Sequence, residues 1–92
     1  MTTWYAHTVD HYFRITFKPP KQLSTNAEKW ITSVKEWFKD LSKKDREFLT
    51  AVFTVDSCFV SWAVQSLPGD TNQHWRTLNR LERDFARFSG LL

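Results

Sequence analysis

The first regular pattern along the chain alternates apolar and polar side chains with a period of two. Between residues 5 and 17 the odd positions are aromatic, aliphatic or histidine, and the even positions are mostly polar. This alternation is typical of a half-buried β-strand. Pro19 and Pro20 would end the strand, because proline cannot donate a hydrogen bond to a ladder. We therefore expect a strand here, with residues 4–9 as either a separate strand or a bent continuation.

A helical pattern follows, in which apolar side chains recur every three or four residues. Thr25 and Glu28 have the T-x-x-E spacing of a capping box, which marks the N-terminus of a helix. An amphipathic helix is therefore predicted to begin near Thr25. Its apolar positions are Ala27, Trp30, Ile31, Val34, Trp37, Phe38 and Leu41.

The middle of the chain allows two interpretations. Ser42 and Asp45 indicate a short helix near residues 43–49, and residues 49–67 are then rich in β-branched and aromatic side chains. That composition, with Asp56 and Ser57 placed to form a turn, favours a β-hairpin. The alternative is a long buried helix whose apolar positions would be Phe48, Val52, Val55, Phe59 and Trp62.

A second amphipathic helix is predicted after the turn at Pro68 and Gly69. Asp70 can cap its N-terminus, and Gly90 can supply the left-handed residue that ends it. The order of elements is then strand, helix, short helix, strand, strand, helix. We expect residues 1–92 to form one α+β domain, in which two amphipathic helices cover one face of a small antiparallel sheet in β-α-β-β-α order.

The last helix gathers arginines on one side. At about 100° per residue these arginines fall within roughly 60° of one another, opposite the apolar side of the helix. No lysine follows Lys44, and a purely solvated face would have no reason to exclude lysine. Planar guanidinium groups suit phosphates or carboxylates, so we interpret this side as a partner-binding site. This arginine ridge consists of Arg76, Arg80, Arg83 and Arg87.

A second set of contacts would follow from the predicted sheet. Tyr12 and Arg14 share a strand face, and Trp62 on the hairpin would join them in a platform for single-stranded nucleic acid. Residues 58–62 resemble the second half of the aromatic strand signature of RNA-recognition-type sheets. The first half of the signature requires a basic residue, a glycine and an aromatic residue, and Val55, Asp56 and Ser57 do not match it. The resemblance therefore extends to the architecture alone and indicates no family.

Composition narrows the function classes. The net charge of +3 permits an anionic partner. Cys58 is the only cysteine, which indicates a reducing compartment, and with no signal peptide or membrane-length apolar run in the sequence we expect a cytoplasmic protein.

His7 and His11 would lie about 13 Å apart on a strand, too far to share a metal ion. No catalytic or metal-binding motif occurs.

These patterns predict a small non-enzymatic binding module without cofactor or metal. We expect its arginine ridge to engage an anionic partner, and we favour nucleic acid. The alternative is a protein-interaction factor, such as a phage-type inhibitor or adaptor, which docks on an acidic protein surface. In that case, spare aromatic side chains would build a homodimer.

Overall fold

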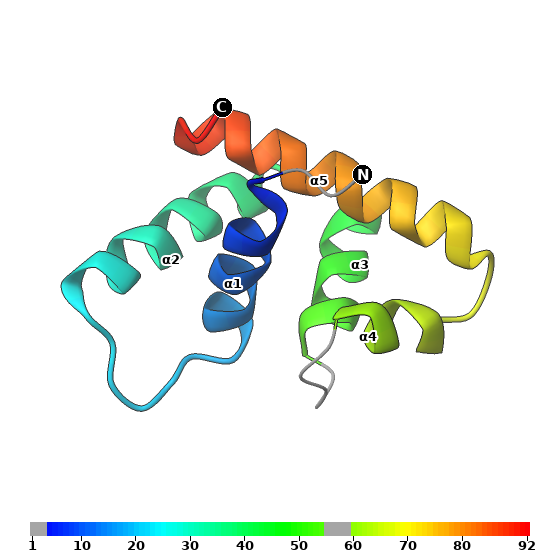
Figure 1. Cartoon of the computed structure of the whole chain (residues 1–92), viewed down its shortest axis with the longest axis horizontal. Helices are drawn as coiled ribbons and strands as arrows, with labels where there is room; N and C mark the ends of the chain where they lie inside the picture. The colour runs from blue at the N-terminus through cyan, green and yellow to red at the C-terminus, as the bar shows by residue number, and fades with distance from the viewer. Residues whose placement is uncertain (1–3, 55–59) are drawn as a thin grey trace.

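The computed structural model describes residues 4–54 and 60–92, and this part of the chain is entirely helical (Figure 1). Turns and loops join the helices within each described range. The helices are α1 (Ala6–Phe17), α2 (Thr25–Lys39), α3 (Lys43–Phe53), α4 (Val60–Ser66) and α5 (Thr71–Ser89). No strand occurs in the described ranges, so the predicted α+β fold with an antiparallel sheet is wrong.

The long helix α5 organises the others. It lies across one side of the molecule and packs on α1, α2 and α4, while α1 and α2 lie side by side and α3 packs on α4 (Figure 1). No other helix covers the upper side of α5 in this view. One long helix therefore has a face in the core and a face left open.

Aromatic rings from four helices meet in the core. The ring of Phe13 stacks on that of Trp37 with centroids 5.4 Å apart, and it meets Phe53 and Phe85 at 5.4 and 5.5 Å. Ring pairs in such geometries add to the stability gained from burial. The cluster of buried side chains consists of Tyr5, Val9, Phe13, Val34, Trp37, Leu49, Val52, Phe53, Ala63, Val64, Leu78, Leu81, Phe85 and Ala86.

The predicted first strand is α1. Val9 and Phe13 are buried whereas His7 and His11 are exposed, although a strand would place all four on one face. Tyr5, Val9 and Phe13 follow one another at intervals of four, which gives a helix an apolar side. The ring contacts of Phe13 with three other helices favour this arrangement over the strand that the alternation suggested.

The predicted hairpin over residues 49–67 is also wrong. Residues 49–53 complete α3 and residues 60–66 form α4, while the expected turn at Asp56 and Ser57 lies outside the described residues. Thr50 fits α3 because its hydroxyl donates to the carbonyl of Arg46 at 2.8 Å. Val52 and Val64 are buried, and that burial outweighs the roughly 0.5 kcal/mol that a β-branched residue costs a helix.

The predicted helix ends were more accurate. The hydroxyl of Ser42 accepts from the amide of Asp45 at 3.2 Å and caps α3, as the sequence indicated. For α2 the cap is Ser24, one residue before the predicted Thr25, and its hydroxyl accepts from the amide of Ala27 at 3.1 Å. In the part of the chain that the structure describes, no helix is long and apolar enough to cross a membrane.

Candidate functional site

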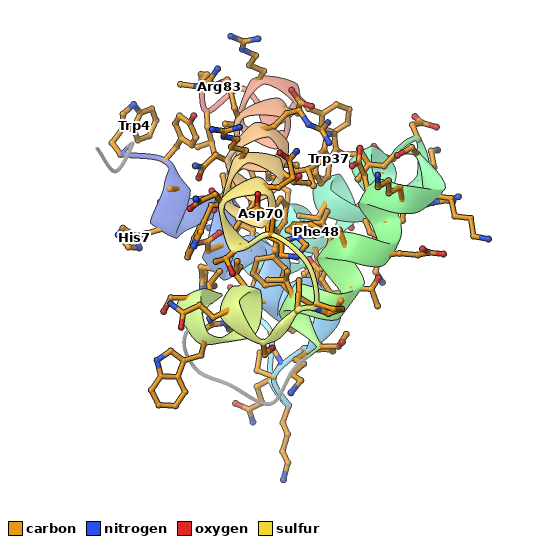
Figure 2. All side chains as sticks on the ribbon, turned by 90° about the vertical axis from the view of Figure 1, so that its right-hand side faces the viewer. Trp4, His7, Trp37, Phe48, Asp70 and Arg83 are labelled. Carbon is orange, nitrogen blue, oxygen red and sulfur yellow. The ribbon has the colours of Figure 1, made fainter. Side chains whose placement is uncertain are left out.

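The arginine ridge lies on the open side of α5. All four of its arginines are exposed, whereas Leu78, Leu81 and Phe85 of the same helix are buried. Figure 2 shows Arg83 at the outer edge of the molecule and Trp37 pointing into its interior. The ridge therefore faces away from the core, in the direction that its helical spacing predicts.

Both ends of α5 are fixed by the residues that the sequence singled out. The Asp70 carboxylate accepts from the amide of Asn72 at 2.9 Å and caps the N-terminus. Gly90 ends the helix in the left-handed conformation with φ 85°, and the amide of Leu91 donates to the carbonyl of Ala86 at 2.9 Å. The four guanidinium groups consequently project from a helix that is capped at both ends.

Arg80 differs from the rest of the ridge because it is paired with acidic side chains. Its guanidinium donates to Oδ1 of Asp45 at 2.7 Å, and it lies 3.9 Å from the carboxylate of Asp84. The first pair joins α5 to the N-terminal turn of α3. With the Arg80 side chain 52% exposed, such a pair contributes only about 0–1 kcal/mol to stability.

The other three arginines carry the uncompensated charge. Arg76, Arg83 and Arg87 form no ion pair or hydrogen bond with residues 4–54 or 60–92 through their side chains. Arg83 and Arg87 are also four residues apart, so their repulsion costs the helix about 0.2–0.5 kcal/mol. The position of Arg87 in the last turn of α5 offsets part of this cost, because the C-terminal end of a helix favours a cation. No acidic side chain of the described residues pairs with either arginine, and a bound anion would do so.

Tyr12 and Arg14, two of the predicted secondary contacts, do not lie on one face. The two side chains are about 160° apart around α1 rather than on one strand face. The Tyr12 ring stacks on Trp30 of α2 with centroids 4.3 Å apart and planes 8° from parallel, and it is half-buried. Trp62 is 67% exposed on α4. The predicted sheet platform of Tyr12, Arg14 and Trp62 is therefore wrong. The resemblance to RNA-recognition-type sheets depended on that sheet, so it no longer applies.

A buried pair of carboxyl groups joins α1 to α5, and sequence reasoning missed it. Glu82 is only 3% exposed, and its carboxyl group is hydrogen-bonded to that of Asp10. No other group of the described residues donates a hydrogen bond to the buried Oδ1 of Asp10 or Oε2 of Glu82. A signal was present in the sequence, since Glu82 lies between Leu81 and Phe85 on the apolar side of the helix.

Burial controls the protonation of this pair. Burial, the hydrogen bond to Asp10 and the charge of Asp10 together raise the pKa of Glu82 to about 10. Burial also raises the pKa of Asp10, while the hydrogen bond from Glu82 and the charges of His7 and Arg14 act in the opposite direction. Glu82 therefore keeps its proton at neutral pH and donates it in a hydrogen bond to Asp10.

The histidines occupy positions that differ from the prediction. His7 and His11 lie one turn apart on the exposed side of α1, so the strand-based separation of 13 Å does not apply. His74 Nε2 donates to the carbonyl of Pro68 at 2.8 Å and closes the loop before α5. Among the described residues, no three His, Cys, Asp or Glu side chains are grouped to hold a metal ion.

Exposed apolar side chains are spread over several elements. Trp4 precedes α1, Trp62 belongs to α4, and Phe88 lies near the end of α5, with exposed fractions of 68%, 67% and 53%. No observation on the described residues tests the homodimer, which stays a prediction.

The open face of α5 and the buried carboxyl pair are thus the two unusual sites of the described structure. One places three arginines without partners at the surface, and the other places two acids in the interior. In comparisons with known proteins, no family model, no curated protein and no solved structure matches the chain.

Proposed function

We propose that this protein is a non-enzymatic binding module of the cytoplasm that engages nucleic acid through the arginine ridge of α5. A single observation carries the proposal: Arg76, Arg83 and Arg87 are exposed on one side of α5 and have no ion pair with the described residues. Guanidinium groups bind phosphate oxygens in a bidentate manner, which accounts for a ridge of arginine without lysine.

The spacing of the free arginines suits a polymer of regularly placed charges. At 1.5 Å per residue, Arg76 lies roughly 10 Å from Arg83 along the helix axis, and Arg87 lies roughly 6 Å further on. Nucleic acid offers a negative charge about every 3.4 Å along each strand, so several arginines can be neutralised together. A protein surface would need an acidic patch shaped to this line, and no feature of the described structure favours that alternative.

Binding to fluorescently labelled oligonucleotides at several salt concentrations tests the proposal. The double variant Arg83→Ala, Arg87→Ala should bind single-stranded and duplex DNA more weakly than the unaltered protein does. The slope of log affinity against log salt should fall by about 1.4–1.8, because each phosphate contact contributes roughly 0.7–0.9.

A matched control separates the ridge from net charge. Lys29→Ala, Lys35→Ala removes the same charge from the exposed side of α2 and should leave most of the affinity and slope unchanged. Equal losses in both double variants would mean that only net charge matters. Absence of binding to either probe at low salt would overturn the proposal and leave an acidic protein surface as the partner class, for which a pull-down is the direct experiment.

A further inference from the structure

The N-terminal half of α5 stands further from the core than its C-terminal half. None of residues 71–77 is buried, and Leu78 is the first buried residue of the helix. The C-terminal half, by contrast, buries Leu81, Glu82, Phe85 and Ala86. In Figure 1 the N-terminal end of α5 lies at the right-hand edge of the molecule. The outer surface of this half is therefore open to a groove, while Trp75 on its inner side packs against the core.

Amide and guanidinium side chains cover the outer surface of this half. Asn72, Gln73, Arg76 and Asn79 are all exposed and fall within roughly 120° of one another around the helix. None of their side chains forms a hydrogen bond with the residues that the structure describes. Four side chains with strong hydrogen-bonding capacity are thus directed outward without partners.

Amide and guanidinium side chains are the ones that commonly read base edges in DNA. Asparagine and glutamine form paired hydrogen bonds with adenine in the major groove, and arginine forms them with guanine. In recognition helices the N-terminal residues contact the bases, while other positions contact phosphates. On α5 the amides occupy the N-terminal half, and Arg83 and Arg87 lie closer to its C-terminus.

We propose that α5 is a recognition helix for duplex DNA, with Asn72, Gln73, Arg76 and Asn79 against base edges in the major groove and Arg83 and Arg87 on phosphates. This inference rests on the proposed function and specifies its substrate. The positive charge of the ridge complements the DNA backbone. Asp45 and Asp84 lie beside Arg80 at 2.7 and 3.9 Å, and the four arginines still exceed these two acids in charge.

The dimensions favour duplex DNA over other nucleic acids. A helix with its side chains is about 10–12 Å across, which matches the roughly 12 Å width of the DNA major groove. The major groove of duplex RNA is too narrow and deep for side chains to read. Single strands are held on exposed stacking rings. Trp4 and Trp62, the most exposed rings of the described residues, lie on elements other than α5, and Phe88, the exposed ring of α5, is turned about 100° around the helix from Arg87.

Selection from a pool of randomised duplex DNA with the full chain tests this inference. An enriched duplex should bind more tightly than a shuffled duplex, the matching RNA duplex or either single strand. Asn79→Ala should weaken binding to the enriched duplex by about 5- to 100-fold, because a bidentate base contact discriminates by that much. Its affinity for the shuffled duplex should not change.

Two further variants distinguish the roles of the side chains. Gln65→Ala removes an exposed amide from α4 and should leave both affinities unchanged. The double variant Arg83→Ala, Arg87→Ala should lower the affinity for the enriched and the shuffled duplex by the same factor, since phosphate contacts carry no sequence information. Unchanged binding of Asn79→Ala to shuffled duplex also shows that this variant is folded.

Three results would overturn the inference. Equal affinity for enriched duplex, shuffled duplex, RNA and single strands would exclude a recognition helix while leaving the proposed nucleic-acid binding intact. Preference for RNA or single strands would assign a different substrate to the same ridge. Absence of binding to every probe would remove the proposed function together with the inference.

Discussion

At Glu82 a carboxylic acid occupies a position where the helical period of α5 calls for an apolar side chain. Its pKa is raised above the ordinary value of 4.5 by burial first and then by Asp10. The folded protein therefore holds a proton that the unfolded chain releases once the pH exceeds about 5. The free energy of unfolding should fall as the pH rises from this point through the folded-state pKa, and the raised pKa of Asp10 acts in the same direction.

Replacing Glu82 by glutamine should remove most of this pH dependence. The amide donates a hydrogen bond to Asp10 at every pH and cannot ionise, so Glu82→Gln should be more stable than the unaltered protein in mildly alkaline buffer. The gain should reach on the order of a few kcal/mol, because each pH unit contributes up to about 1.4 kcal/mol per proton. Urea unfolding followed by tryptophan fluorescence between about pH 5 and pH 9 measures it.

The control for this experiment is Glu36→Gln on the exposed side of α2. It removes the same charge without touching the buried pair, so its pH profile should follow that of the unaltered protein. A flat profile for the unaltered protein would show that Glu82 does not retain a proton in the folded state.

At the scale of single elements, the termini of α5 decide how firmly the ridge is held. Gly90 has φ 85°, a conformation that costs other residues about 1–2 kcal/mol. A Cβ atom built at this position would meet no atom within 4 Å. The cost of a substitution here is consequently one of backbone conformation and not of steric conflict.

Gly90→Ala should therefore lower the free energy of unfolding by about 1 kcal/mol, and Gly90→Asn should lower it less, because asparagine tolerates the left-handed region. Thermal unfolding monitored by circular dichroism ranks the three proteins. If alanine and asparagine were equally costly, the left-handed conformation would not be the cause.

Local signals in the sequence predicted helix ends well and helix identity less well. Ser42, Asp70 and Gly90 act within a few residues of their own position, so their roles were evident from spacing alone. The period-two pattern around Phe13 led to the wrong secondary structure. The helix there is stabilised by ring contacts with Trp37, Phe53 and Phe85, which lie between 24 and 72 positions away along the chain. Similarly, the β-branched residues of α3 and α4 are helical because packing outweighs their weak intrinsic preference.

The candidate site was predicted only in part, again because sequence patterns indicate local geometry and not contacts between distant residues. The position of the ridge depends only on the geometry of one helix, and the sequence was sufficient to place its four arginines on one side. The pairing of Arg80 with Asp45 joins residues 35 positions apart and could not be inferred locally. Likewise, the contact between Asp10 and Glu82 requires knowing that α1 packs on α5.

At the scale of the whole molecule, a few rings hold the helices together. Phe85 of α5 contacts Phe13 and Trp37 with centroid distances of 5.5 and 5.3 Å and is completely buried. It thus joins the helix that carries the ridge to both α1 and α2. Domains of this length have a total stability of roughly 5–15 kcal/mol.

Phe85→Ala should lower the free energy of unfolding by about 3–5 kcal/mol, since it removes a buried ring and leaves a cavity. Phe88→Ala removes the same ring from an exposed position of the same helix and should cost much less. Urea titration of both variants provides the comparison. Similar losses for the two would contradict the central place of Phe85 in the core.

Because α5 supplies both core side chains and the ridge, display of the arginines depends on completion of the fold. This helix is the last of the five to be synthesised, and it packs against α1, which is the first. Contacts so distant along the chain form late and slow the folding of a helical protein. A nascent or partly folded chain would therefore hold its arginines on an undocked segment, and a nucleic acid that favours the docked helix would act as a ligand that stabilises the finished protein.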